Sequence, residues 1–318
     1  MGTEFRRRNG RTEELLKKTE IRGIIVPIIT PMNDDESVNV EVLKEQTDRM
    51  IEAGIHAIFC FGTNGEGYIL NSKEKELVLS TVVKHVNGRV PVYAGSGCIS
   101  TRETIEQSKM AEACGADVLS IITPSFAAAS QDEIERHYET VAAAVPDMPI
   151  VLYNIPARTG NKIDPATVGK LCQVENIVGA KDSSGDFKNI LGYIDEGKKK
   201  KNGSFSVLSG NDQLILWTLK AGGSGGISGC ANAYPHNMAM IYDEFIAGNW
   251  DEAKKYQDAI GPFRKNFAGC NPNTVVKTAV RLMGYDVGLC RAPFNMIPDA
   301  KIEAIKKNIE ENKANGMS

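Results

Sequence analysis

Apolar residues recur along the chain in eight short runs, each followed by a polar or glycine-containing turn and then by a longer stretch with helical periodicity. This alternation is typical of a parallel sheet in which a helix follows each strand. The runs are "GIIVPIIT" (23–30), "AIFCFG" (57–62), "VPVYAGSG" (90–97), "DVLSIITP" (117–124), "PIVLYN" (149–154), "IVGAKDS" (177–183), "FSVLSG" (205–210) and "GGISG" (225–229). Eight successive strand and helix units predict a (β/α)₈ TIM barrel.

An open, doubly wound sheet is the alternative architecture. Such a sheet normally carries a glycine-rich phosphate loop after its first strand. Here the first apolar run leads into "TPMNDDES" (30–37), which contains no glycine. The barrel is therefore the preferred fold.

The pattern changes at both ends of the barrel. The first 20 residues are highly charged and precede the first predicted strand, so we expect a disordered or loosely helical tail, or an addition from expression. After the eighth strand, several segments with helical periodicity follow one another without an intervening strand. We therefore predict a tail at 1–20, a barrel at 21–248 and a C-terminal helical appendage at 249–318.

Composition narrows the possible partners. Of 318 residues, 42% are hydrophobic and 24% are charged, which suits a globular protein, and the net charge of -3 gives no basic excess for nucleic acids or anionic membranes. No apolar stretch is long enough to cross a bilayer or to act as a signal peptide. Seven scattered cysteines without a CxxC pair indicate a reducing, cytoplasmic location. Small molecules are the expected ligands.

Lys181 ends the sixth apolar run, where an ammonium group in the protein interior would be costly. One interpretation is that its side chain extends to water beside Asp182. The other is functional, because the active site of such a barrel forms where the strands end. Tyr153 closes the preceding strand, and neighbouring strands lie about 4.8 Å apart. The two side chains can therefore meet inside the barrel mouth.

A neutral lysine amine attacks ketones, and a nearby phenol can move the protons that imine formation requires. The turn "GTNG" after the second strand adds backbone N–H groups that can hold a carboxylate, and Thr63 can extend a proton relay to Tyr153. Taken singly, Tyr153 is more often a core aromatic residue and "GTNG" an ordinary turn. Together they predict a Schiff-base site for a 2-oxo acid such as pyruvate.

The chain resembles the dihydrodipicolinate synthase / N-acetylneuraminate lyase family of class I pyruvate-dependent aldolases over about residues 21 to 300. The matching motifs, in order, are "GTNGE" (62–66), "AGSG" (94–97), "GADVLSIITP" (115–124), "YNIPARTG" (153–160), "GAKDSSGD" (179–186), "LSGND" (208–212) and "GGSGGISG" (222–229). The resemblance implies that Lys181 forms the imine, that Tyr153 is the acid/base, and that Gly62, Thr63 and Asn64 hold the carboxylate. It also implies that Gly210 and Ile227 line the far side of the site.

The second substrate is left open by the sequence. Arg158 resembles the arginine with which the synthase branch binds aspartate semialdehyde, which favours the synthase. However, Phe126 stands where that branch has a tyrosine donated across a subunit interface, and Asn64 stands where it has a second threonine. Asn64 and "AGSGC" (94–98) are similar to 4-hydroxy-2-oxoglutarate aldolases. An aldolase for that substrate or for a 2-keto-3-deoxy sugar acid is therefore the alternative.

Other classes of function are less well supported. The four histidines are dispersed, without an HxH or HExxH arrangement, so no metal is expected, and the glycines at 222–229 lack the order of a nucleotide loop, so no cofactor is expected. A barrel that binds a 2-oxo acid without turnover is the alternative from another class. The resemblance also implies a homo-oligomer, a dimer or a tetramer of two dimers.

Overall fold

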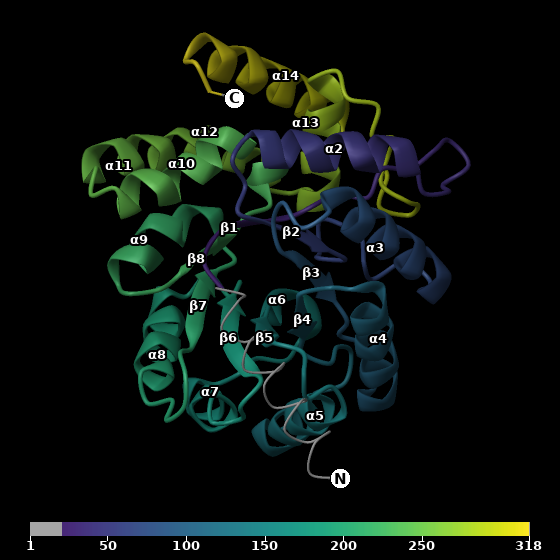
Figure 1. Cartoon of the computed structure of the whole chain (residues 1–318). Coiled ribbons are helices and arrows are strands. Elements are labelled where there is room, and N and C mark those ends of the chain that lie inside the picture. Colours follow the sequence, from purple (N-terminus) through teal and green to yellow (C-terminus); the bar gives the residue numbers. More distant parts are fainter. Residues whose placement is uncertain (1–20, 318) are drawn as a thin grey trace.

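Residues 21–317 are described by the computed structural model (Figure 1). The predicted tail at 1–20 lies outside the described residues. Within the described part of the chain, eight parallel strands close into a barrel in sequential order, so the predicted TIM barrel is confirmed. The strands are β1 (Gly23–Pro27), β2 (Ala57–Cys60), β3 (Val92–Gly95), β4 (Val118–Ile122), β5 (Ile150–Asn154), β6 (Ile177–Asp182), β7 (Ser206–Ser209) and β8 (Gly225–Ile227). Each lies inside the apolar run that predicted it.

Helices surround this barrel and continue beyond it. They are α2 (Val40–Glu52), α3 (Ser72–Val86), α4 (Thr101–Cys114), α5 (Gln131–Ala144), α6 (Pro156–Thr159), α7 (Pro165–Leu171), α8 (Phe187–Gly197), α9 (Ile215–Lys220), α10 (Pro235–Ile246), α11 (Trp250–Ala259), α12 (Gly261–Arg264), α13 (Pro272–Leu282) and α14 (Asp299–Ala314). Asn71 caps α3 in a capping box with Glu74, and the Ser100 hydroxyl accepts from the N–H of Glu103 at the start of α4. Local sequence therefore defines where these two helices begin.

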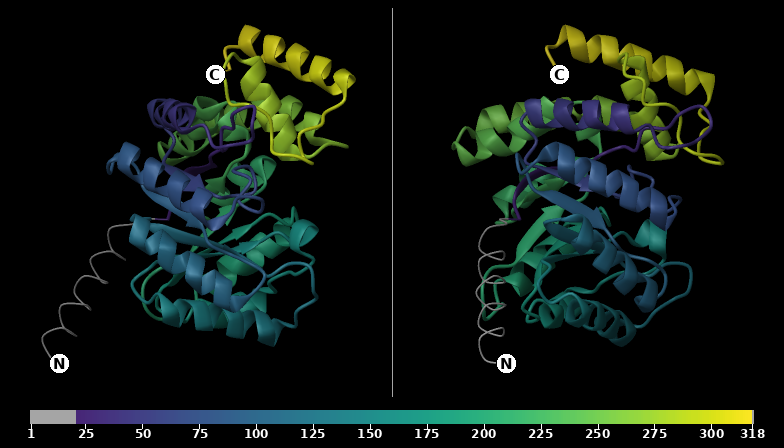
Figure 2. Two further views of the ribbon diagram at one scale, coloured as in Figure 1. Left: turned by 90° about the vertical axis from the view of Figure 1, so that its right-hand side faces the viewer. Right: turned by 45° about the vertical axis from the view of Figure 1, so that its right-hand side comes forward.

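The C-terminal appendage forms as predicted. Figure 2 shows α13 and α14 stacked together on the side of the barrel away from α5. The boundary at residue 249 stays a prediction, although α11 begins at Trp250. Across residues 21–317, no helix combines the length and the apolar character that crossing a bilayer requires.

Apolar side chains form two separate cores, as expected for a barrel wrapped in helices. The larger core lies between the strands and the helices. The smaller one fills the barrel interior and includes Phe59, Tyr93, Val118, Val151 and Ile227. Because side chains alternate along a strand, the register of each strand decides which residues enter the interior.

The register between β5 and β6 shifts by one residue at the base of the pair. Ile150 pairs with Ile177, but Val151 pairs with Gly179, so Val178 is the extra residue of a bulge. Beyond the bulge, Tyr153 pairs with Lys181. Paired residues of parallel strands point to the same face, so the bulge turns Lys181 toward the interior; without it, Ala180 would face inward.

Candidate active site

Lys181 lies inside the barrel and is buried. Its side chain is 3% exposed. The next residue, Asp182, faces the other side of the strand, where its carboxylate accepts hydrogen bonds from Asn154 (2.7 Å), Asn189 (2.6 Å) and Ser184 (2.6 Å). The interpretation in which Lys181 extends to water beside Asp182 is therefore wrong.

Tyr153 is the nearest aromatic contact of this lysine. The Lys181 Nζ lies 3.8 Å from the centre of the Tyr153 ring and 5.6 Å from that of Phe59. The Tyr153 hydroxyl lies 3.0 Å from Thr63 Oγ1, within hydrogen-bond distance. The structure thus brings together the three residues for which sequence reasoning predicted a catalytic role.

The Tyr153 hydroxyl is set up to exchange protons. Burial alone would raise the pKa of Tyr153, but the positive charge of Lys181 and hydrogen bonds with Thr63, Lys181 and Ser183 outweigh it, so the pKa lies below the usual value of tyrosine. A phenol with a lowered pKa gives up its proton more readily, which suits a general acid.

The turn after β2 presents unpaired donors. Among residues 21–317, no acceptor is found for the backbone N–H groups of Thr63 and Asn64, and both residues are partly exposed. Two successive free N–H groups beside a hydroxyl form a cradle suited to a carboxylate. The Asn64 side chain lies against Gly229 of the loop after β8, where an added Cβ would come within 2.8 Å of its Oδ1.

Gly210 follows β7 and Ile227 ends β8, and their predicted place on the far side of the site stays a prediction. A Cβ at Gly210 would lie 1.9 Å from Ser183 Oγ and 2.8 Å from Lys181 Cε, so any larger residue here would displace one or both of these side chains. Ile227 is buried in the interior core. Neither residue lines the two cavities described next.

Two connected cavities open beside Tyr153 and Thr63. The inner one, of about 80 Å³, is lined by both residues and by Gly62, Ser120 and the Phe59 ring, among others. The outer one, of about 520 Å³, shares Thr63, Gly67, Tyr68, Gly97 and Ile122 with it. Arg158 is exposed and lines the outer cavity, so it faces a ligand that extends outward from the inner cavity.

Known proteins share the sequence pattern and the fold of this chain. The model of the Dihydrodipicolinate synthetase family matches residues 20–312. The chain belongs to this family. A 4-hydroxy-tetrahydrodipicolinate synthase from Methanopyrus kandleri is 37% identical over 295 residues, which cover 92% of this chain and 96% of that protein. Because it belongs to this family, the protein is a pyruvate-dependent lyase of the class I aldolase type.

Solved structures of the same family have the same fold. YagE, a prophage protein of the dihydrodipicolinic acid synthase family from E. coli K12 solved in complex with pyruvate, is 30% identical with a TM-score of 0.88, over 93% of this chain and 99% of that one. A monomeric dihydrodipicolinate synthase variant is 29% identical, also with a TM-score of 0.88, over 92% of this chain and 97% of that one.

Sequence reasoning did not predict that the C-terminal appendage contacts the turn of the candidate site. The Asn273 side chain of α13 donates to the Thr63 carbonyl oxygen at 2.7 Å. One helical turn later, Lys277 Nζ forms an ion pair with Glu66 at 2.7 Å and donates to the Leu289 carbonyl oxygen at 2.9 Å. The second Glu66 oxygen accepts from the Arg291 N–H at 2.8 Å. Helix α13 therefore holds the turn that presents Thr63 and Asn64.

This support is needed because the turn has an unusual backbone. Phe61 and Glu66 have φ angles of 65° and 56°, in the left-handed region that side chains other than glycine rarely adopt. The Thr30 hydroxyl also donates to the Gly65 carbonyl oxygen at 2.7 Å, from the loop after β1. Contacts from α13 and from the β1 loop thus fix a conformation that the turn alone would not favour.

Phe126 lies outside both cavities of its own chain. It is 98% exposed, with a φ of 79°, in the loop between β4 and α5. The neighbouring Ser125 lines the outer cavity, but Phe126 does not. A role for Phe126 in catalysis therefore requires a second subunit.

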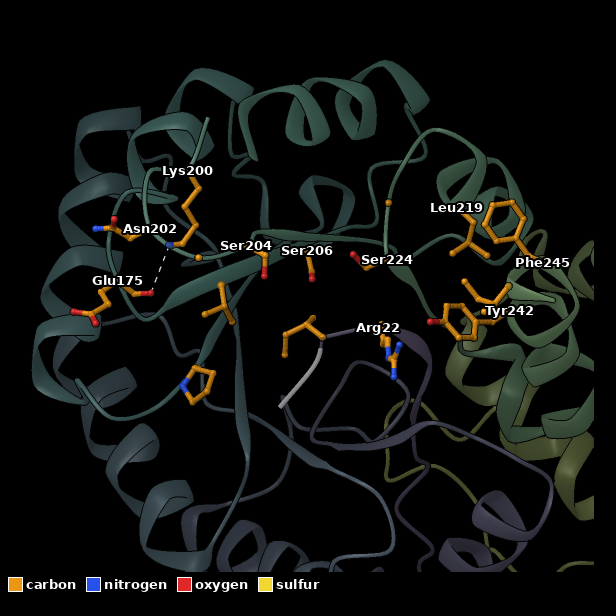
Figure 3. Close-up of a pocket in the computed structure, with 16 residues that line it drawn as sticks. Arg22, Glu175, Lys200, Asn202, Ser204, Ser206, Leu219, Ser224, Tyr242 and Phe245 are labelled. Atoms are coloured by element: carbon orange, nitrogen blue, oxygen red, sulfur yellow. Dashed lines mark hydrogen bonds between the residues drawn. The ribbon is translucent and has the colours of Figure 1, made fainter. Parts of the chain in front are cut away.

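A larger cavity of about 640 Å³ lies at the opposite end of the barrel, where the strands begin (Figure 3). Ser206 and Ser224 line it at the starts of β7 and β8, together with Lys200. The Lys200 ammonium donates to the carbonyl oxygens of Cys172 (2.6 Å) and Val174 (3.0 Å), among others. Since catalysis in TIM barrels occurs where the strands end, we assign the active site to the cavities beside Tyr153 despite their smaller volumes.

We expect the Glu66–Lys277 ion pair to stabilise the fold strongly only as an intact pair. Lys277→Met leaves the fully buried Glu66 carboxylate without its cation, and we expect it to lower the free energy of unfolding by about 3 to 5 kcal/mol. The double variant Glu66→Gln/Lys277→Met removes both charges and is expected to recover most of this loss. Urea unfolding of the three proteins provides the measurement.

Lys306→Met is the matched control, because it breaks an exposed pair with Glu303 and is expected to cost less than about 1 kcal/mol. A loss for Lys277→Met no larger than that of the control would show that the buried pair does not hold the turn.

Proposed function

We propose that Lys181 forms an imine with pyruvate and that the resulting enamine adds to an aldehyde. In the reverse direction, cleavage of a 2-oxo acid leaves the same enamine on Lys181, and its protonation and hydrolysis release pyruvate. The observation that supports this most is the buried contact of Lys181 with Tyr153, whose hydroxyl lies 3.0 Å from Thr63. The amine attacks the ketone carbon of pyruvate, and the carbinolamine loses water as Tyr153 supplies a proton. The Thr63 and Asn64 N–H groups and the Thr63 hydroxyl hold the carboxylate.

We place the aldehyde partner in the outer cavity. Lys181 itself lines neither cavity, but its contact Tyr153 lines the inner one, so the carbonyl carbon of the aldehyde must approach the enamine beside Tyr153. Its remaining chain then extends past Thr63 toward Arg158. The planar guanidinium group of Arg158 suits a carboxylate on that chain. Thr123, Ser125 and Asn271 also line the outer cavity and offer polar contacts to a hydroxylated chain.

Aldolase activity on 4-hydroxy-2-oxoglutarate or a 2-keto-3-deoxy sugar acid is the second candidate. Phe126 has no hydroxyl group, and Asn64 offers amide hydrogen bonds where a hydroxyl would pass a proton. Both changes weaken the relay that the synthase reaction uses. We therefore propose that the protein is at best a weak 4-hydroxy-tetrahydrodipicolinate synthase and prefers another aldehyde.

Assembly and location complete the proposal. The exposed Phe126 suits a homo-oligomer, a dimer or a tetramer of two dimers, in which this loop meets the outer cavity of a neighbour. All seven cysteines are free thiols, which supports a cytoplasmic location. The intact Lys181, Tyr153 and Thr63 argue against a barrel that only binds a 2-oxo acid.

Enamine formation can be tested without knowing the aldehyde. Incubated with pyruvate alone in D₂O, the protein is expected to exchange the pyruvate methyl protons for deuterium, which NMR follows directly. Lys181→Met is expected to abolish the exchange, whereas Lys188→Met, at an exposed lysine of α8, leaves it unchanged. Exchange that survives Lys181→Met would refute the assignment of this lysine.

Arg158→Ala is expected to reduce kcat/KM for a carboxylated aldehyde such as aspartate semialdehyde or glyoxylate by about 30-fold, because one charge-assisted hydrogen bond of about 2 kcal/mol is lost. Deuterium exchange into pyruvate and turnover of uncharged glyceraldehyde serve as internal controls and should change little. Equal losses in all three assays would mean that Arg158 supports the fold or the pyruvate site instead.

Phe126→Tyr is expected to raise the rate with aspartate semialdehyde about tenfold or more, because a general acid typically contributes 10² to 10⁴ in rate. Phe126→Leu, which adds no hydroxyl, is the control and should give no gain. A kcat/KM of the unaltered protein above about 10⁴ M⁻¹s⁻¹ with this aldehyde would show instead that the protein is an efficient synthase.

A further inference from the structure

Ser120 of β4 has a buried hydroxyl group without a partner. Its side chain is 1% exposed, and its Oγ makes no hydrogen bond to any group of residues 21–317. A buried hydroxyl without a partner is unfavourable, so it marks a position where a ligand can supply the missing contact. Other buried polar groups of the described residues share this condition, but among them only Ser120 lines the inner cavity.

The strand pattern points this hydroxyl into the active site. Val118, two residues earlier on β4, belongs to the core of the barrel interior, so Ser120 faces inward as well. Its partner on β3 is Gly95, where an added Cβ would lie 2.7 Å from the Phe61 carbonyl oxygen. The glycine leaves the cavity open in front of Ser120, facing Thr63 and Tyr153.

We propose that Ser120 is a catalytic residue for the carbon–carbon bond step, where its hydroxyl donates a hydrogen bond to the oxygen of the aldehyde. The inference rests on the proposed function. The enamine carbon attacks the aldehyde carbon, a C–C bond forms, and the electron pair of the C=O double bond moves to the aldehyde oxygen. The Tyr153 phenolate left by the dehydration step has by then regained a proton from the methyl group of the pyruvate iminium, as the enamine formed. The aldehyde oxygen takes this proton from the Tyr153 hydroxyl, and water then hydrolyses the new iminium to free Lys181 and the product.

This assignment separates two stages of the reaction. Imine and enamine formation use Lys181, Tyr153 and Thr63, and no aldehyde oxygen is present during them. Negative charge develops on that oxygen only during bond formation, or in reverse during cleavage, and a preorganised donor acts on this stage alone. Ser120 also lies in the same chain as Lys181, so this contact does not depend on the loop of Phe126.

The test compares the two stages in four proteins that differ at position 120. Thr and Val have nearly the same shape but only Thr carries a hydroxyl, so Ser120→Thr and Ser120→Val form a matched pair, with Ser120→Ala as the smallest change. For each variant, deuterium exchange into pyruvate reports enamine formation, and kcat/KM with aspartate semialdehyde, glyoxylate or glyceraldehyde reports bond formation. The unaltered protein is the fourth member of the set.

We expect Ser120→Ala and Ser120→Val to lower kcat/KM for addition by about tenfold or more, the effect of losing one donor to a developing oxyanion. Deuterium exchange should stay within about twofold in all variants, and Ser120→Thr should keep most of the addition activity. Unchanged addition in Ser120→Ala, or equal loss of exchange and addition, would overturn the inference. If the proposed function itself is wrong, the unaltered protein will show no deuterium exchange into pyruvate.

Discussion

The one-residue register shift between β5 and β6 is the feature on which the site depends. Val178 is the extra residue on β6, opposite the bond between Ile150 and Val151 of β5. Each later residue of β6 therefore points to the opposite face from the one it would have without the bulge. Lys181 therefore enters the interior beside Tyr153, while Asp182 faces outward to a set of hydrogen-bond donors. Barrel closure then buries Lys181, and Gly210 leaves room for its side chain.

The C-terminal appendage contacts the loops around the candidate site and does not only cover the barrel. Arg264 pairs with Asp212 at 2.8 Å, in the loop after β7, and Arg291 pairs with Glu74 at 2.7 Å, at the start of α3. With the buried Glu66–Lys277 pair, these contacts connect the appendage to three segments at the mouth of the barrel. A candidate site that is built from loops gains precise geometry from such support.

The sequence predicted what depends on local patterns. Apolar runs located all eight strands, and the polar residues that end them identified Lys181, Tyr153, Thr63 and Arg158. It could not predict the roles of Asn273 and Lys277, because the contacts of these residues with the turn span 210 and 211 positions and leave no periodic signal. The sequence also provides no indication of a role for Ser120, because a single serine within an apolar strand does not distinguish a functional residue from a structural one. Its importance appears only when the cavity and the missing partner are seen together.

The central claim is that Lys181, turned toward the barrel interior, is the reacting amine, and chemical trapping of the imine tests it most directly. Borohydride added during incubation with pyruvate reduces an imine to a stable secondary amine, and peptide mapping by mass spectrometry locates it. The adduct is predicted on Lys181, in the peptide that contains "GAKDSSGD" (179–186), and should be absent from Lys181→Met. An adduct on any other lysine, or no adduct at all, would contradict the account.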